Sequence, residues 1–334
     1  MKILVTGGLG YIGSHTIVKL LKKNYEVICL DNLINSDLGT KKKITKIARK
    51  NFKFHNLDIT NLNDLKKILK KYNKIDCIIH FASLIYVPES LEQPLKYYNN
   101  NLTSLINIIE IAKKYNSGLI FSSSSTVYGY PKKLPITEDM PLGISPSPYG
   151  KTKKIGEEIL MDVAKQENLS IISLRYFNPI GAHESGLIGE RPVKNPIHIL
   201  PYITQTAIGI KKNLNIFGNN YKTKDGTCVR DFVHVNDVAE AHIKCIPFIK
   251  KNKKKYYKFN IGVGKGTSIL ELVNEFERVT GISIPFKFVK RREGDVAELW
   301  SNCNKSKKYL NWTPKYNLEK MIRSAWNWEK KSNK

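Results

Sequence analysis

The chain has 334 residues, of which 41% are hydrophobic and 25% charged, a composition typical of a soluble globular protein with one large α/β domain or two lobes. A net charge of +26 ordinarily suggests a nucleic-acid partner. However, only about eight of the 55 basic residues are Arg, the side chain suited to bidentate phosphate recognition, so we expect no nucleic-acid partner.

Two further features narrow the class of protein. There is no window of about 18 uncharged apolar residues, which argues against a membrane span. Five scattered cysteines without a C-x-x-C pair argue for reduced thiols in a cytoplasmic protein and against a cysteine-based metal site.

Strand-length apolar runs alternate with amphipathic helical patterns over the first 175 residues, which predicts a parallel sheet covered by helices. The expected strands are 3–5, 27–30, 52–57, 77–81, 119–121 and 171–174. The expected helices between them are 14–21, 62–71, 102–114 and 155–165.

After residues 178–181 this alternation stops and the chain becomes richer in Pro and Gly. We expect shorter strands near 215–217 and 258–261, and helices at 235–245 and 269–280. The prediction is an α/β protein with a Rossmann-type, doubly wound parallel sheet over residues 1–177. A smaller α/β substrate-binding lobe follows over 178–334, with some segments returning to the first domain.

A glycine-rich turn joins the first strand to the first helix, with Gly7, Gly10 and Gly13 in G-x-x-G-x-x-G spacing. This spacing permits a tight turn and a close approach of the backbone to a pyrophosphate. Asp31 ends the second strand 18 residues after Gly13, where a carboxylate can accept hydrogen bonds from the adenosine ribose. Because that carboxylate would repel a 2′-phosphate, the motif predicts NAD rather than NADP.

A second acidic residue closes the third expected strand. Asp58, followed by Ile59, can meet the adenine amino group of the cofactor. It can equally cap the turn that follows the strand, and spacing alone does not distinguish the two roles.

A Tyr followed four residues later by a Lys places both on one helical face. The chain contains three such pairs: Tyr128/Lys132, Tyr149/Lys153 and Tyr316/Lys320. Gly and Pro inside the first pair make a helix implausible there, and the third pair is remote in sequence from the sheet. The second pair follows Pro148, a favoured first-turn residue, about 25 residues after Ser124 at the end of the fifth strand. We therefore predict Tyr149, Lys153 and Ser124 as the catalytic residues.

This combination suits the oxidation of a secondary alcohol, in which a hydroxyl loses its proton as a hydride leaves carbon. Free tyrosine, with a pKa of about 10, is too weak a base near neutrality. A cationic Lys153, the positive nicotinamide ring and the helix N-terminus are expected to stabilise the phenolate and lower the pKa of Tyr149. The Ser124 hydroxyl can orient the sugar hydroxyl or relay its proton.

Short motifs along the whole chain form one pattern. They are Val5-Thr6-Gly7-Gly8, Gly13-Ser14-His15, Asp31-Asn32-Leu33, Ile79-His80-Phe81-Ala82, Phe121-Ser122-Ser123-Ser124, Thr126-Val127-Tyr128-Gly129, Ser147-Pro148-Tyr149-Gly150-Lys151, Leu174-Arg175-Tyr176-Phe177-Asn178-Pro179 and Gly181-Ala182-His183. The most specific are Asp225-Gly226-Thr227, Arg230-Asp231, His234-Val235 and Arg291-Arg292-Glu293-Gly294-Asp295. With these motifs the chain resembles the extended short-chain dehydrogenase/reductases, and within them the UDP-glucose 4-epimerases.

The resemblance implies a tightly held NAD, a UDP-sugar substrate and a 4-keto intermediate, with Tyr149 as base and acid in the interconversion of UDP-glucose and UDP-galactose. The implied cofactor contacts are Gly7, Gly10, Tyr11, Ile12, Gly13, Asp31, Asn32, Asn35, Ser36, Asp58, Ile59, Phe81, Ala82, Asn100, Tyr149, Lys153 and Phe177. The implied substrate contacts are Ser124, Tyr149, Asn178, His198, Phe217, Arg230, Arg292, Asp295 and Leu299. It also implies a homodimer, through helices near residues 102–114 and 155–165, and no metal.

Three positions depart from the family pattern. Ile85 stands where a Lys near the nicotinamide is usual, so one cofactor hydrogen bond is expected to be lost. Ile197-His198-Ile199 replaces an Asn-Asn-Leu stretch near the diphosphate, with His198 as a partial substitute. Leu299 occupies the position that gates the sugar pocket, which leaves N-acetylated substrates open but disfavoured.

Other functions remain as alternatives. Related dehydratases use an Asp-Glu pair where this chain has Ser125 and Thr126, and neither can act as a carboxylic acid. A UDP-glucuronate epimerase or decarboxylase would require a further cation that the sequence does not reveal. A non-catalytic NAD-binding or nucleic-acid-binding protein would not require the intact set of Tyr149, Lys153 and Ser124.

Overall fold

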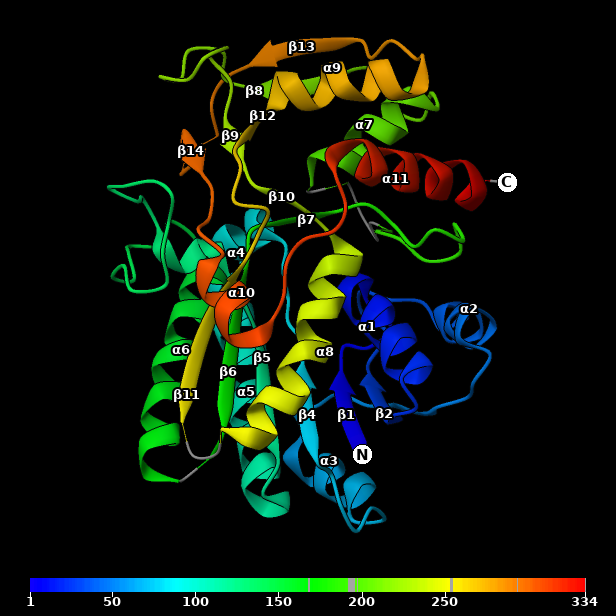
Figure 1. The fold of residues 1–334 in the computed structure, drawn as a ribbon, viewed down its shortest axis with the longest axis vertical. Helices are drawn as coiled ribbons and strands as arrows, with labels where there is room; N and C mark the ends of the chain where they lie inside the picture. The colour runs from blue at the N-terminus through cyan, green and yellow to red at the C-terminus, as the bar shows by residue number, and fades with distance from the viewer. Residues whose placement is uncertain (168, 192–195, 197, 253–254, 293, 334) are drawn as a thin grey trace.

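A parallel seven-stranded sheet forms the centre of the larger lobe in this computed structural model, which describes every residue except 168, 192–195, 197, 253–254, 293 and 334 (Figure 1). The strand order is β11-β6-β5-β4-β1-β2-β3, and each neighbouring pair is parallel. The bounds are β1 (Lys2–Thr6), β2 (Glu26–Asp31), β3 (Lys53–Asn56), β4 (Cys77–His80), β5 (Gly118–Ser124), β6 (Ile171–Tyr176) and β11 (Tyr256–Ile261). The order reverses between β4 and β2, at the switch point where open α/β sheets bind nucleotides. The predicted Rossmann-type sheet is confirmed.

Helices cover both faces of this sheet and bury a separate core on each. One core includes residues of α1 (Tyr11–Lys22), α2 (Gly39–Ala48), α8 (Val235–Lys251) and α10 (Asn304–Leu310). The other includes residues of α3 (Leu62–Leu69), α5 (Pro94–Tyr115) and α6 (Pro148–Gln166). Ile3 and Val5 belong to the first core and Leu4 to the second, because alternate side chains of a strand point to opposite faces.

The smaller lobe lies beyond the carboxyl ends of these strands, at the top of Figure 1. Its core includes residues of α7 (Ile199–Ala207), α9 (Ile269–Thr280), α11 (Leu318–Ser332) and β8 (Leu214–Phe217). Strand β13 (Phe286–Val289) is parallel to β8 and is largely exposed. The shorter strands are β7 (Asn178–Ile180), β9 (Val229–Arg230), β10 (Phe232–His234), β12 (Thr267–Ser268) and β14 (Glu298–Leu299). Two short helices, α4 (Val87–Glu92) and η1 (Ser125–Tyr128), follow strands β4 and β5 of the larger lobe.

Helix α9 has the bounds that the sequence predicts, because both of its ends carry strong local signals. Ser268 and Glu271 form a reciprocal capping box at its start. Gly281 ends it in the left-handed conformation, with φ +72°. By contrast, α5 and α6 begin earlier than predicted, each with a proline in its first turn.

Parts of the second half of the chain belong to the larger lobe. Strand β11 pairs with β6 from Tyr256↔Ile171 to Ile261↔Tyr176, and α8 packs against α1. The division of the chain at residues 177 and 178 stays a prediction.

Within the described ranges, no helix is both long and apolar enough to cross a bilayer. The same part of the chain has no group of three or more His, Cys, Asp or Glu side chains that could hold a metal ion. All five cysteines are free thiols.

Candidate active site

The glycine-rich turn leaves no room for side chains at two of its positions. Gly7 has φ +64°, and a Cβ there would lie 2.7 Å from the backbone nitrogen of Ala82. A Cβ on Gly13 would lie 2.3 Å from the carbonyl oxygen of Gly7. Helix α1 starts after Gly10 without a side-chain cap, so its first N–H groups are available to an anion. The turn therefore fits a pyrophosphate at a helix N-terminus.

Asp31 holds this turn against the loop that follows β2. Its side chain is buried, and Oδ2 accepts a hydrogen bond from the backbone N–H of Leu9 at 2.9 Å. Oδ1 accepts from Leu33 N at 3.0 Å and from Ser36 Oγ at 2.7 Å. These three bonds leave one acceptor site on Oδ2, so the predicted ribose contact is compatible with them and stays a prediction.

Asp58 caps a turn, one of the two roles that its position allowed. Its Oδ1 accepts hydrogen bonds from Thr60 N at 2.9 Å and Thr60 Oγ1 at 2.8 Å. The next residue, Ile59, is buried, and its carbonyl accepts from Asn107 of α5 at 2.9 Å. The adenine contact of Asp58 stays a prediction.

The remaining predicted cofactor residues lie around the same edge of the sheet. The Phe81 ring lies 4.6 Å from that of His242, and Tyr11 donates to the carbonyl of Gly181 at 2.5 Å. Asn32 accepts from Ile34 N at 3.2 Å. Asn35 is exposed, whereas Ile12 packs against the first core and Phe177 is buried.

Asn101 is a positioning residue that the sequence did not reveal. Asn100, the predicted contact, donates to Asn101 Oδ1 at 2.9 Å. Asn101 in turn bonds both backbone groups of Leu84 and donates to Thr152 of α6 at 3.1 Å. It therefore ties the loop after β4 to α6, the helix that carries Tyr149 and Lys153.

The three predicted catalytic side chains meet where β5 ends and α6 begins. Ser147 caps α6 by accepting from Gly150 N at 3.2 Å, which sets Tyr149 in the first turn. The Tyr149 side chain lies beside Ser124, whose hydroxyl acts on the Tyr149 hydroxyl as a hydrogen-bonding neighbour. Lys153 lies one turn later, with Nζ 5.9 Å from the centre of the Tyr149 ring and 2.8 Å from the Ser122 carbonyl oxygen to which it donates.

Burial dominates the protonation of this pair. It raises the pKa of Tyr149 to about 12, against the opposing effect of the Ser124 hydrogen bond, and lowers the pKa of Lys153 to about 7. In the protein alone the pKa of Tyr149 is therefore raised, because neither charged form is well solvated, and its lowering with NAD bound stays a prediction. A bound positive charge is needed to favour the phenolate.

The other two Tyr/Lys pairs serve structural roles. Tyr128 lies in the 3-10 turn η1, is buried and donates to Asn260 Oδ1 at 2.6 Å. Tyr316 stacks on His234 with ring centres 4.0 Å apart. Of the three pairs, only Tyr149 and Lys153 lie together on one helix, α6, which begins where β5 ends.

The predicted substrate residues form a cationic cluster on the smaller lobe. Asp295 lies between two arginines, with Oδ1 3.5 Å from Arg230 Nη2 and Oδ2 3.5 Å from Arg292 Nε. The Arg292 guanidinium lies 4.2 Å from the centre of the Phe217 ring. Two guanidinium groups and one carboxylate leave a net positive charge, which suits an anionic ligand.

Two further predicted substrate residues line this region. Asn178 Oδ1 is buried and has no hydrogen-bond partner among the described residues. Leu299 packs beside Phe177 in a small apolar cluster and pairs in register with Arg230. An unpaired buried acceptor next to a cationic cluster is compatible with a polar ligand.

His198 begins helix α7 and has a charged partner. Its Nδ1 donates to the Glu190 carboxylate. Burial lowers the pKa of His198, but the Glu190 carboxylate outweighs burial and leaves that pKa raised, while Arg292 acts in the opposite direction. The departures at Ile197 and the motif residue Glu293 lie outside the described residues.

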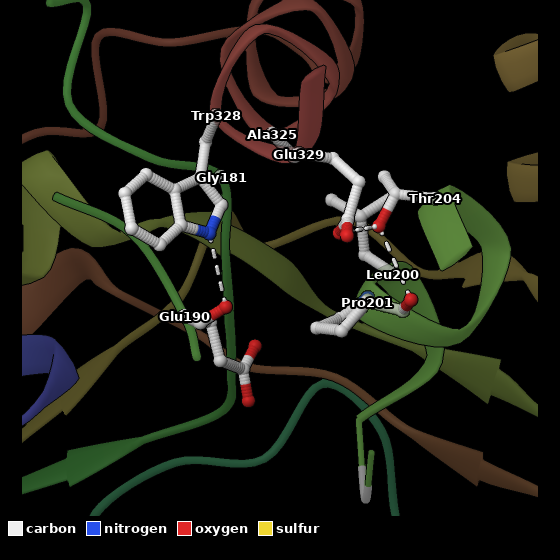
Figure 2. Close-up of a pocket in the computed structure, with 8 residues that line it drawn as sticks. All are labelled: Gly181, Glu190, Leu200, Pro201, Thr204, Ala325, Trp328 and Glu329. Atoms are coloured by element: carbon white, nitrogen blue, oxygen red, sulfur yellow. Dashed lines mark hydrogen bonds between the residues drawn. The ribbon is translucent and has the colours of Figure 1, made fainter. Parts of the chain in front are cut away.

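A small cavity lies between α7 and α11, and Glu190 is among the residues that line it (Figure 2). Its volume is about 10 Å³, which admits at most one water. Figure 2 shows Trp328 donating to the Glu190 carbonyl at 3.1 Å and Thr204 donating to Glu329 at 2.6 Å. This cavity is part of the packing of the smaller lobe and is too small for a sugar nucleotide.

Comparison with known proteins places this geometry in a family. The model of the GDP-mannose 4,6 dehydratase family matches residues 4–325. The UDP-glucose 4-epimerase of Pasteurella multocida is 47% identical over 336 residues, covering 100% of this chain and 99% of that protein. That of Bacillus subtilis is 45% identical and covers 98% and 97%. The chain belongs to the UDP-glucose 4-epimerase family.

Solved UDP-glucose 4-epimerases have the same fold. The enzyme from Stenotrophomonas maltophila, with bound NAD and formylated UDP-arabinopyranose, has a TM-score of 0.96 and 38% identity, covering 100% of this chain and 99% of that one. The enzyme from Bifidobacterium longum, in complex with NAD+ and UDP, has a TM-score of 0.95 and 40% identity, with the same coverage. The resemblance to UDP-glucose 4-epimerases that the motifs indicated is confirmed.

Proposed function

We propose that the protein is an NAD-dependent isomerase that interconverts UDP-glucose and UDP-galactose through a 4-keto sugar. The observation that carries this proposal is the meeting of Tyr149, Ser124 and Lys153 beside the glycine turn. Full-length similarity to UDP-glucose 4-epimerases, including two solved with NAD, supports the cofactor and the reaction.

The residues of the glycine turn, Asp31 and Lys153 would hold NAD, which supplies a hydride acceptor and a positive ring when bound. Tyr149 takes the proton of the sugar 4-hydroxyl and later returns it to the 4-keto oxygen on the other face. Ser124 orients that oxygen through its own hydroxyl. Lys153, held by the Ser122 carbonyl, stabilises the phenolate while it carries its proton.

On the substrate side, Arg230 and Arg292 would bind the diphosphate, with Phe217 against the uracil and Asn178 as a further polar contact. The net positive charge of the arginine cluster supports this assignment. The UDP part would stay anchored while the keto sugar turns. Inversion then follows from return of hydride to the opposite face, with no net redox change.

Elimination is disfavoured as an alternative reaction. A dehydratase requires an acid and a base beside Ser124, and the following turn η1 has Ser125 and Thr126 there. The Thr126 hydroxyl is buried without a partner among the described residues, and an aliphatic hydroxyl cannot replace the carboxylic acid that elimination requires. Other UDP-sugars, such as N-acetylhexosamines, depend on the space beside Leu299.

We further propose a homodimer that pairs α5 and α6 across a two-fold axis. Helix α5 exposes 80% of Leu95 and 48% of Ile106, which an equivalent apolar face could cover. The five free cysteines support a reducing compartment, the cytoplasm. Sedimentation of a monomer at micromolar concentration would refute the dimer.

The reaction is tested by incubating the purified protein with UDP-galactose and analysing the sugar nucleotide. Formation of UDP-glucose without net NADH supports the proposal. A dehydrated 4-keto product would assign the chain to the dehydratases, and no change in the presence of added NAD would contradict the epimerase.

A further inference from the structure

A buried ion pair lies one helical turn beyond the predicted catalytic lysine. Glu157 follows Lys153 by four residues and Tyr149 by eight, so the three side chains lie along one face of α6. The Glu157 carboxylate is 0% exposed and pairs with Arg175 of β6, which is 1% exposed. The guanidinium donates to it from Nη2 at 2.5 Å and from Nε at 2.9 Å, a two-pronged contact.

The same carboxylate also holds the strand that carries the catalytic serine. Ser123 Oγ donates to Glu157 Oε1 at 2.5 Å, and Ser123 directly precedes Ser124. Tyr256 of β11 donates to the other oxygen at 3.0 Å. Helix α6 is thereby joined at a single residue to strands β5, β6 and β11.

The other side of the Arg175 guanidinium holds the turn that follows Ser124. Its Nη1 donates to the Tyr128 hydroxyl at 2.9 Å and to the Glu138 carbonyl at 3.3 Å. Tyr128 is the last residue of η1, which begins directly after Ser124. The ion pair therefore contacts the segments on both sides of Ser124 and the helix that carries Tyr149.

Stability alone does not explain this arrangement. Removing two charges from water offsets most of their attraction, and apolar residues of similar volume often replace a buried ion pair with no loss of stability. Apolar side chains, however, cannot accept from Ser123 or donate to Tyr128. What only the ion pair provides is a fixed orientation of these segments.

We propose that Glu157 and Arg175 are positioning residues that set the register of α6 against β5, so that Tyr149, Lys153 and Ser124 meet in one geometry. This inference rests on the proposed function, because it acts through that reaction's catalytic residues. Arg suits the role better than Lys, since its planar fork can contact Glu157 and Tyr128 at once.

The test replaces the whole pair, as Glu157→Leu with Arg175→Met, and measures thermal stability, bound NAD, kcat and KM. We expect a folded protein that retains NAD, with KM for the UDP-sugar within about threefold of the wild type and kcat lowered about 10- to 100-fold, as for a small misplacement of reacting groups. A wild-type kcat in this variant would overturn the proposal. If the double variant does not fold, Arg175→Lys should lower kcat with an unchanged KM, and an unchanged kcat there would also overturn it.

The control is Glu329→Gln, which alters a buried carboxylate of the smaller lobe that Thr204 contacts at 2.6 Å (Figure 2). We expect it to lower the melting temperature but not kcat. If Glu329→Gln lost as much stability as the ion-pair variants and its kcat fell as far as theirs, the fall in kcat would follow from lost stability alone. The proposal would then be wrong.

A crystal structure of the double variant provides a readout that needs no substrate. The proposal expects the Tyr149 and Ser124 hydroxyls to move relative to one another, and an arrangement identical to that of the wild type would overturn the proposal. A wild-type protein without epimerase activity would refute the proposed function instead, and the structure of the variant would still decide the role of the ion pair.

Discussion

Two arginine–carboxylate clusters serve the proposed reaction in opposite ways. The pair of Glu157 and Arg175 is buried in the larger lobe, and its hydrogen bonds end on the protein itself. In the smaller lobe, the side chain of Arg292 is 53% exposed and the Asp295 carboxylate is shared with Arg230 at 3.5 Å.

The two clusters differ in whether the arginines have hydrogen-bond donors free for a ligand, and in how far solvent surrounds their charges. A buried guanidinium such as that of Arg175, whose hydrogen bonds all end inside the protein, can orient its neighbours but is not free to bind a ligand. Arg292 is partly solvated and lies 3.5 Å from Asp295, so it can exchange this carboxylate for a diphosphate, an attraction that salt screens. Arg230 is held more firmly, because its Nη1 also donates to the backbone carbonyls of Val229 and Val296. The first cluster should therefore act on kcat and the second on KM.

Tyr149→Phe should have the largest effect on kcat. Because Glu157 and Arg175 are proposed to act through Tyr149, replacing them should not lower kcat further than Tyr149→Phe does. Without the phenolic oxygen no group takes the sugar proton, and we expect kcat to fall about 10³-fold with NAD still bound. Steady-state kinetics and the absorbance of bound cofactor measure the two quantities. Tyr316→Phe, in another Tyr/Lys pair, is the control and should retain activity. A Tyr149→Phe variant with normal turnover would remove the basis of the mechanism.

Arg230→Ala tests the second cluster. Loss of charge-assisted hydrogen bonds to a diphosphate, each worth about 1.5–3 kcal/mol, should raise KM about 10- to 100-fold. We expect a smaller rise for Arg292→Ala, whose side chain is more exposed, and in both variants kcat should change less than KM. Arg278→Ala, which loses only surface contacts to Glu275 and Glu319, is the control. A fall in kcat at constant KM would contradict the division of roles between the clusters.

Acid should lower the free energy of unfolding, in part through His80, which is buried in the larger lobe. Burial, with Lys153 nearby, lowers the pKa of His80 to about 3. Below about pH 6.5 this histidine binds a proton in the unfolded chain but stays neutral in the folded protein. The free energy of unfolding therefore falls as the pH drops from 6.5 towards 3. At pH 5 this amounts to up to about 2 kcal/mol for His80. Urea unfolding at pH 7 and 5 measures the loss, which should be smaller in His80→Gln; an equal loss would rule out this histidine as a cause.

Salt should have the smallest effect and should separate the clusters without any mutation. Between about 0.05 and 0.5 M salt the Debye length shortens severalfold, so attraction of the diphosphate to Arg230 and Arg292 weakens. We expect KM to rise about two- to fivefold and kcat to stay constant. A kcat that changes with salt would indicate that ions reach the pair of Glu157 and Arg175, and would contradict the proposed division of roles.

Local patterns predicted much of the larger lobe. Consecutive apolar residues such as Ile3, Leu4 and Val5 mark a strand buried on both faces, and the glycine turn and Pro148 mark the starts of α1 and α6. Because parallel strands end at one edge, Ser124 and Tyr149 could be placed together from their spacing alone. Helix α2 was not predicted, because only Ile44 and Ala48 of its residues are buried and lysines fill its exposed face.

Other features depend on contacts that sequence spacing does not reveal. The pairing of Glu157 with Arg175 joins a helix to a strand, and the only local signal was the spacing of four residues from Lys153. The pKa of Tyr149 followed burial rather than the charge of Lys153, a balance that only the three-dimensional surroundings determine. Asn100 and Asn101 are adjacent and identical, so the sequence gave no reason to expect that Asn101 is the one that contacts Leu84.

The most direct test of the mechanism is to convert UDP-galactose in D₂O and to measure deuterium at C4 of the UDP-glucose formed. If a hydride leaves C4 and returns to the same carbon within one closed site, the product carries no deuterium there. Deuterium at C4 would mean that the hydrogen exchanges with solvent as a proton, and would contradict the oxidation and reduction that we assign to Tyr149 and NAD.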